Sequence, residues 1–164
     1  MFSRIVVATD GTESGEAAVS FTAALAQEHG AIVRVVHVNE LLVGGRGVAA
    51  ETELEAMNIV DRAVARLRRA AVDADGVHYL ANCFTISDRI AAVAHEWGAD
   101  VIVFGSKRRR RFVRFGGAGV RERVTAATGL PTLTAPSPLA VPSRLETRHL
   151  VRSPAPAESP SGVS

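Results

Sequence analysis

A glycine-containing, strongly basic segment spans residues 105–119, directly after the apolar run at residues 101–104. Six of the 19 Lys and Arg residues in the chain lie within residues 107–114. Glycines allow backbone N–H groups to approach phosphate oxygens, and concentrated positive charge attracts polyanions. The segment therefore predicts a phosphate-binding loop or a docking site for an acidic partner. The alternative is a solvated basic loop that only keeps the protein soluble.

A second polar segment, Thr9-Asp10-Gly11-Thr12, follows the apolar run at residues 5–8. The carboxylate of Asp10 is suited to accept hydrogen bonds from a ribose or to help hold a metal ion. Asp is also a favoured cap at the start of a helix, and a helical pattern begins just after this segment. Asp10 therefore has two interpretations, ligand binding and helix capping, and one side chain can serve both.

Motifs of several other chemistries are missing from the sequence. The Gly-x-x-x-x-Gly-Lys-Ser/Thr loop and the Gly-x-Ser-x-Gly elbow do not occur, and no Gly-x-Gly-x-x-Gly follows the first apolar run. The five His residues show no ligand-like spacing with Cys83, which argues against a zinc site. Cys83 itself, beside Phe84 in an expected strand, is interpreted as a small buried side chain. We expect no catalytic residues and no metal beyond Mg²⁺ carried by a nucleotide.

Strand-like and helix-like segments alternate along the chain, and they must position these residues. Alternation of this kind predicts an α/β fold: an open, doubly wound, five-stranded, mainly parallel sheet with helices on both faces. Residues 39–50 are expected to form a loop. The expected strands lie near residues 4–9, 32–38, 77–83, 100–104 and 132–135, and the expected helices near 14–29, from about 51 to Gly76, 87–97 and 120–127.

The predicted topology places both candidate segments at one edge of the sheet. Ligands of open α/β sheets bind outside the carboxyl ends of the strands. The segments that begin at Thr9 and Gly105 follow the expected first and fourth strands. We therefore expect them to line one common site.

Composition sets the domain organisation and the compartment. Residues 1–137 are expected to form one domain, and residues 138–164 a flexible tail rich in Pro, Ser and Arg. A net charge of +2 is too small to indicate a nucleic-acid-binding protein. The sequence has one cysteine, no secretory signal and no apolar stretch long enough to span a membrane, so we expect a cytoplasmic protein without membrane contact.

Four segments together resemble the universal stress protein family over residues 2–135. They are RIVVATDGTES, VVHVNE, GADVIVFGSK and VRERVTAATGLPTLT. The resemblance implies a Rossmann-like fold of the adenine nucleotide alpha hydrolase type, with ATP as the ligand. It also implies a homodimer through the last strand, at residues 131–135.

The resemblance assigns the adenosine end of the ligand to residues near the first two strands. Ala8, Thr9 and Asp10 match positions near the adenine and the ribose. Val38 matches the position whose backbone pairs with the adenine.

The phosphate loop of the family is only partly kept. The family pattern is Gly, two residues, Gly, nine residues, then Gly followed by Ser or Thr. It aligns with Gly105, Arg108, Ala118 and Gly119, and Val120 follows as the first residue of the expected helix. Only Gly105 matches. Arg108 cannot adopt a positive φ cheaply, and Gly119 lacks the hydroxyl group, so we expect ATP binding to be weak or lost.

Three functions follow from this sequence. The first is a regulatory module for stress tolerance, without turnover and with weak or lost ATP binding. The second is an ATP-binding family member with slow or no ATPase activity. The third is an adaptor that docks an acidic protein partner through residues 107–114. Base stacking on nucleic acid has little support, because only Phe112 and Phe115 are aromatic in this segment.

Overall fold

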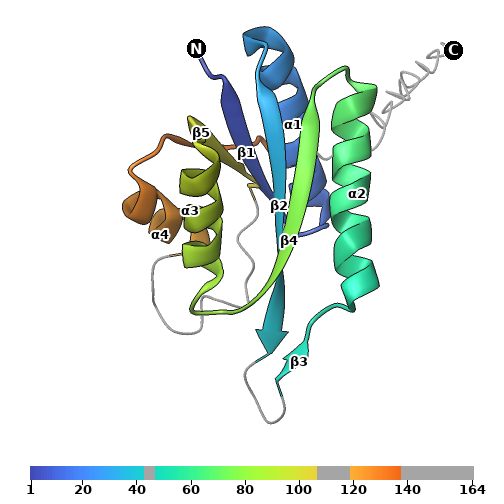
Figure 1. The fold of residues 1–164 in the computed structure, drawn as a ribbon, viewed down its shortest axis with the longest axis vertical. Coiled ribbons are helices and arrows are strands. Elements are labelled where there is room, and N and C mark those ends of the chain that lie inside the picture. The colour runs from blue at the N-terminus through green and yellow to red at the C-terminus, as the bar shows by residue number, and fades with distance from the viewer. Residues whose placement is uncertain (43–46, 107–118, 138–164) are drawn as a thin grey trace, which may run out of the picture.

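The computed structural model describes residues 1–42, 47–106 and 119–137. Helices and strands alternate through these residues, as the sequence pattern predicts (Figure 1). The strands are β1 (Arg4–Thr9), β2 (Ile32–Leu42), β3 (Val48–Ala49), β4 (Ala74–Asn82), β5 (Val101–Phe104) and β6 (Thr132–Thr134), and the helices are α1 (Glu13–His29), α2 (Glu53–Arg69), α3 (Ile86–Trp97) and α4 (Val120–Thr128).

The sheet has the order β4-β2-β1-β5-β6, and all neighbouring pairs in this order are parallel. Helices α1 and α2 cover one face, and α3 and α4 cover the other (Figure 1). The predicted α/β fold class, with helices on both faces of a mainly parallel sheet, is therefore confirmed. The order reverses at β1, the central strand, which places β2 and β5 on either side of it.

The core has one layer on each face of the sheet, because successive side chains of a strand point to opposite faces. In β1, Ile5 and Val7 pack in the cluster under α1 and α2. Val6 packs in the cluster under α3 and α4. All three side chains are fully buried, which explains why the central strand is a continuous apolar run.

The sheet has one strand more than the predicted five. The two-residue β3 pairs antiparallel with the end of β2, in the segment expected to be a loop. Strand β2 is longer than expected because its second half pairs with β4, from Val38 opposite Tyr79 to Leu41 opposite Asn82. The glycines in this segment favour a loop, but pairing with β4, which is distant in sequence, extends β2 into it.

Helix α2 ends at Arg69, and the prediction that it runs to Gly76 is wrong. Ala71 has a φ of +57°, which breaks the helix, and β4 begins at Ala74. Gly76 lies inside β4, where a Cβ atom would collide with the side chains of Val60 and Val64 on α2. The glycine allows close contact between strand and helix and does not act as a helix stop.

The environment predicted for Cys83 is also wrong. Strand β4 ends at Asn82, whose side-chain oxygen accepts hydrogen bonds from the backbone N–H groups of Phe84 at 3.0 Å and Thr85 at 3.1 Å. Cys83 is half-buried in the resulting turn, and Phe84 is 71% exposed. The Asn side chain turns the chain before either residue can enter the sheet.

Two further predictions concern the C-terminal tail and the absence of membrane-spanning segments. The tail at residues 138–164 lies outside the described residues. Throughout the described part, no helix combines the length and the apolar character needed to cross a membrane.

Candidate functional site

The loop between β1 and α1 is organised around Thr12. Its hydroxyl accepts the backbone N–H of Gly15 at 3.4 Å, so Thr12 is the N-cap of α1. Asp10 Oδ1 accepts the backbone N–H of Thr12 at 3.1 Å and its hydroxyl at 2.6 Å. Asp10 therefore supports the cap and is not the cap itself. Its carboxylate lies next to the end of β1, where the resemblance places the ribose.

Gly15, which the sequence reasoning passed over, lets α1 approach this loop. A Cβ atom on Gly15 would lie 2.5 Å from the hydroxyl oxygen of Thr9 and 2.9 Å from Oδ1 of Asp10. Any larger residue would push the loop away from the helix. A glycine in the first turn of a predicted helix is the signal that could have identified this contact.

The end of β5 meets the same helix. A Cβ atom on Gly105 would lie 2.5 Å from Oγ and 2.6 Å from the backbone oxygen of Ser14. The loop after β1 and Gly105, the first residue after β5, therefore both pack on the first turn of α1. The prediction that they share one edge of the sheet is confirmed.

The helices α1 and α4 differ at their N-termini. The first turn of α1 is capped by Thr12 and carries Glu13 and Glu16, which disfavour a bound anion there. Helix α4 begins after Gly119, which has no side chain to cap it, and the one acidic residue of its first turn, Glu122, pairs with Arg121 at 3.1 Å. The first N–H groups of a helix have no partner within the helix and are well suited to receive a phosphate. Of the two, α4 is the better phosphate site.

Gly119 and Val120 lie at this N-terminus of α4. Gly119 has a φ of −66°, which any residue adopts, and among the described residues a Cβ atom there would meet only the carboxylate end of Glu122. A serine is therefore sterically acceptable at position 119. Val120 is half-buried against the core under α3 and α4. Arg108 and the basic residues 107–114 lie outside the described residues.

Ala8 and Val38 lie on the sheet face that α3 and α4 cover. Both are partly buried against the cluster there, and Val38 pairs in register with Tyr79 of β4. Thr9 pairs in register with His37 of β2, whose ring lies on the opposite face together with Val35 and Asn39. Ala8 and Val38 thus sit beside the carboxyl end of β1 on the side of α3 and α4, whereas the Thr9 hydroxyl lies beside Gly15 of α1.

A buried polar group on the other face was missed by the sequence reasoning. The His37 ring bridges the backbone oxygen of Thr9, 2.9 Å from Nδ1, and Oε2 of Glu51, 2.6 Å from Nε2. The Asn39 side chain donates to the backbone oxygen of Glu51 at 2.7 Å and accepts its N–H at 3.1 Å. The alternation of polar residues in VVHVNE could have placed His37 and Asn39 on one face. No local pattern marks Glu51.

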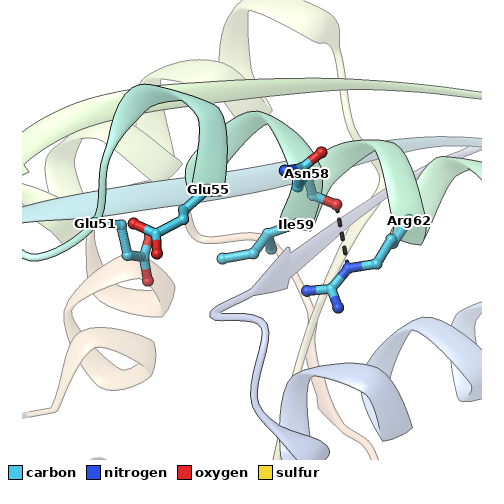
Figure 2. A pocket seen from close by; sticks show the side chains of 5 residues that line it. All are labelled: Glu51, Glu55, Asn58, Ile59 and Arg62. Atoms are coloured by element: carbon cyan, nitrogen blue, oxygen red, sulfur yellow. Dashed lines mark hydrogen bonds between the residues drawn. The ribbon is translucent and has the colours of Figure 1, made fainter.

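Glu51 also borders a hollow along α2 (Figure 2). The hollow has a volume of about 500 Å³ and is lined by Glu51, Glu55, Asn58, Ile59 and Arg62. Ile59 supports the loop after β1, because a Cβ atom on Gly11 would lie 2.9 Å from its side chain. In the described ranges, no three His, Cys, Asp or Glu side chains are grouped so that they could hold a metal ion.

The chain resembles several solved structures. A universal stress protein from Archaeoglobus fulgidus in complex with dAMP is 26% identical, with a TM-score of 0.61, and the match covers 82% of this chain and 98% of that one. A universal stress protein in complex with cAMP is 19% identical, with a TM-score of 0.65 and coverage of 83% and 98%. An Arabidopsis thaliana family protein with AMP bound is 13% identical, with a TM-score of 0.57 and coverage of 80% and 90%.

No curated protein sequence matches the chain. The Universal stress protein family, in contrast, matches residues 1–136, which include every described helix and strand. The sheet order, the loop after β1 and the N-terminus of α4 all lie within this match. The chain therefore belongs to the universal stress protein family.

Proposed function

We propose that this protein is a regulatory module for stress tolerance that binds an adenine nucleotide weakly and does not turn it over. The observation that carries the proposal is the N-terminus of α4 at Gly119, which lies at the same edge of the sheet as Asp10. Asp10 would accept hydrogen bonds from the ribose, and the N–H groups after Gly119 would receive a phosphate. Relatives of the same fold hold dAMP, cAMP and AMP, which supports an adenine nucleotide as the ligand.

Weak affinity for ATP follows from the residues that depart from the family pattern. Arg108 replaces a glycine, and Gly119 replaces the residue whose hydroxyl would donate to a phosphate oxygen. The guanidinium groups of residues 107–114 partly compensate, because charged hydrogen bonds to phosphate are strong. Regulation without turnover is the simplest function for such a site, because the sequence has no evident general base for water near a γ-phosphate.

Calorimetric titration with ATP tests the proposal on three proteins. Wild type should bind weakly, with an affinity that falls steeply with salt, since exposed charges are screened beyond about 8–10 Å at physiological ionic strength. The Arg108→Ala, Arg109→Ala double variant should bind more weakly, by about 1–3 kcal/mol for each charged hydrogen bond lost. The triple variant Arg108→Gly, Ala118→Gly, Gly119→Ser rebuilds the family pattern and should bind more tightly. Tight binding by wild type that neither set of changes alters would contradict the proposal.

The basic segment also supports a second candidate function, docking of an acidic protein partner. Six basic residues within residues 107–114 would attract an acidic surface whether or not a nucleotide binds. The same double Ala variant separates the two functions. If docking is the role of the segment, the variant should lose binding to a poly-glutamate peptide while its ATP titration stays unchanged.

We also propose that the protein forms a cytoplasmic homodimer through β6. In the described residues, β6 pairs only with β5, so its outer edge is a template for a second strand. The strand has three residues and lies between Pro131 and Pro136, so the interface should be weaker than is usual for the family. Sedimentation at micromolar concentration should show dimer in exchange with monomer, and monomer alone would contradict the proposal.

A further inference from the structure

Two successive hydrogen bonds join the side chain of Glu51 to the backbone at the start of the candidate nucleotide loop. Glu51 Oε2 lies 2.6 Å from Nε2 of His37, and Nδ1 of the same ring lies 2.9 Å from the backbone oxygen of Thr9. His37 is 1% exposed and Thr9 is 7% exposed, so water competes little with the contact between them, and the Glu51 side chain is 21% exposed. The loop that carries Asp10 begins directly after Thr9, the residue whose backbone oxygen accepts the last of these hydrogen bonds.

The chemistry of the two contacts sets where the hydrogen atoms lie. A carbonyl oxygen only accepts, so Nδ1 of His37 carries a hydrogen that it donates to Thr9. One further hydrogen must lie between Nε2 and the Glu51 carboxyl, because two lone pairs at 2.6 Å would repel each other. Glu51 therefore holds the ring in the orientation that serves Thr9.

The backbone of Glu51 is held separately. Asn39 both donates to and accepts from it, at 2.7 Å and 3.1 Å. The segment that leads from β3 into α2 thus stays on β2 without the Glu51 side chain. That side chain is left with one described partner, the ring of His37.

We propose that Glu51 is a positioning residue for the nucleotide site, acting through His37 on the peptide group between Thr9 and Asp10. The carbonyl of that peptide group belongs to Thr9, and its N–H belongs to Asp10. Holding the carbonyl fixes the direction in which Asp10 leaves β1, and with it the contact of Asp10 with Thr12. This inference rests on the proposed function, since it concerns the same site.

The test compares three variants by AMP titration and by backbone amide NMR signals. Glu51→Ala leaves Nε2 of His37 without its partner, and it should weaken AMP binding by roughly five- to a hundredfold and shift the amide signals of Asp10, Gly11 and Thr12. Glu51→Gln can still hydrogen-bond to Nε2. It should therefore keep the wild-type AMP affinity and the wild-type amide signals. Glu53→Gln is the matched control, since Glu53 makes a similar 2.7 Å contact with His78 but is exposed. Glu53→Gln should change neither the AMP affinity nor the amide signals of Asp10, Gly11 and Thr12.

Several results would overturn the inference. One is AMP binding by Glu51→Ala equal to wild type. Another is an equal loss in the Ala and Gln variants together with an equal fall in melting temperature, which indicates a purely structural role. If wild type binds no AMP, the proposed function fails, and the amide signals alone decide the inference: unshifted Asp10, Gly11 and Thr12 signals in Glu51→Ala overturn it.

Discussion

The carboxylate of Asp100 ties the start of β5 to the start of β1. It accepts hydrogen bonds from the backbone N–H groups of Ser3 at 2.6 Å and Arg4 at 2.8 Å. These bonds, that of Ser3 first, hold the pKa of Asp100 below its ordinary value, and the nearby charge of Arg4 adds to the effect. Since the group is exposed, we expect a modest contribution to stability.

The direction of the pH dependence follows from this lowered pKa. The contribution is present above the unfolded-chain pKa of about 3.9 and is lost as the pH falls through the lower folded value. Asp100→Asn should therefore be less stable than wild type at pH 7 and should lose less stability on acidification. Thermal unfolding between pH 7 and pH 3 measures this. The exposed Glu28→Gln is the control, and a wild-type acid profile in Asp100→Asn would contradict the assignment.

Gly105 makes a second residue-scale prediction, on the packing of β5 against α1. In Gly105→Ala the new Cβ would lie 2.6 Å from a backbone oxygen that cannot move without moving α1. We expect a loss of roughly 1–3 kcal/mol in the free energy of unfolding, the usual range for overpacking. Gly119→Ser is the matched control, because among the described residues its new Cβ atom meets only the flexible end of Glu122. Denaturant unfolding of both variants measures the difference, and equal stability would show that β5 does not pack tightly here.

At the scale of elements, α2 begins with a capping box. The hydroxyl of Thr52 accepts the backbone N–H of Glu55 at 3.2 Å, and Glu55 Oε2 accepts the backbone N–H of Thr52 at 2.8 Å. The hydrogen bonds from Thr52, the backbone one first, lower the pKa of Glu55. The box fixes where α2 starts, two residues after Glu51.

Removal of the cap tests this arrangement. Thr52→Ala should lower the free energy of unfolding by about 1 kcal/mol, because the backbone N–H of Glu55 loses its partner and the Glu55 carboxylate loses the Thr52 hydroxyl. Thr52→Ser keeps the hydroxyl and should remain close to wild type. Denaturant titration compares the three proteins. A Ser variant as unstable as the Ala variant would show that the methyl group of Thr52 matters and the cap does not.

At the scale of the whole molecule, both described layers of the core are built from residues that end at Ala135. Ala135, just after β6, is 1% exposed and packs in the cluster under α1 and α2. The hydroxyl of Ser137 contacts that of Ser106 at 2.9 Å, so the last described residues return to the candidate site. We propose that the folded domain is residues 1–137.

A chain that ends at Ser137 tests this boundary. It should unfold cooperatively at nearly the same temperature as the full chain, because the residues removed have too little clustered apolar surface to offset the entropy of ordering them. Differential scanning calorimetry of both chains gives the comparison. A midpoint lower by many degrees would show that Leu145 or Leu150 packs on the domain.

The sequence alone determined the features that depend on short stretches of chain. Strand β1 and helices α1, α3 and α4 appear close to where they were predicted, because periodicity and turn residues act over a few neighbours. The common edge for the segments after Thr9 and Gly105 also followed from the sequence. Parallel strands joined by helices leave no other arrangement for those ends.

Only the tertiary structure decided the contacts between distant residues. The sequence pattern predicts a helix stop at Gly76 because the role of this glycine depends on Val60, which lies on α2 and approaches Gly76 only in the folded chain. Strand β3 forms because β2 continues beyond the residues whose local pattern predicts a strand, and the end of β2 then pairs with residues 48–49. The link from Glu51 through His37 to Thr9 joins β1, β2 and the segment before α2, so no local pattern predicts it. Local sequence patterns predict where helices and strands lie along the chain. The packing of those helices and strands decides which side chains come into contact.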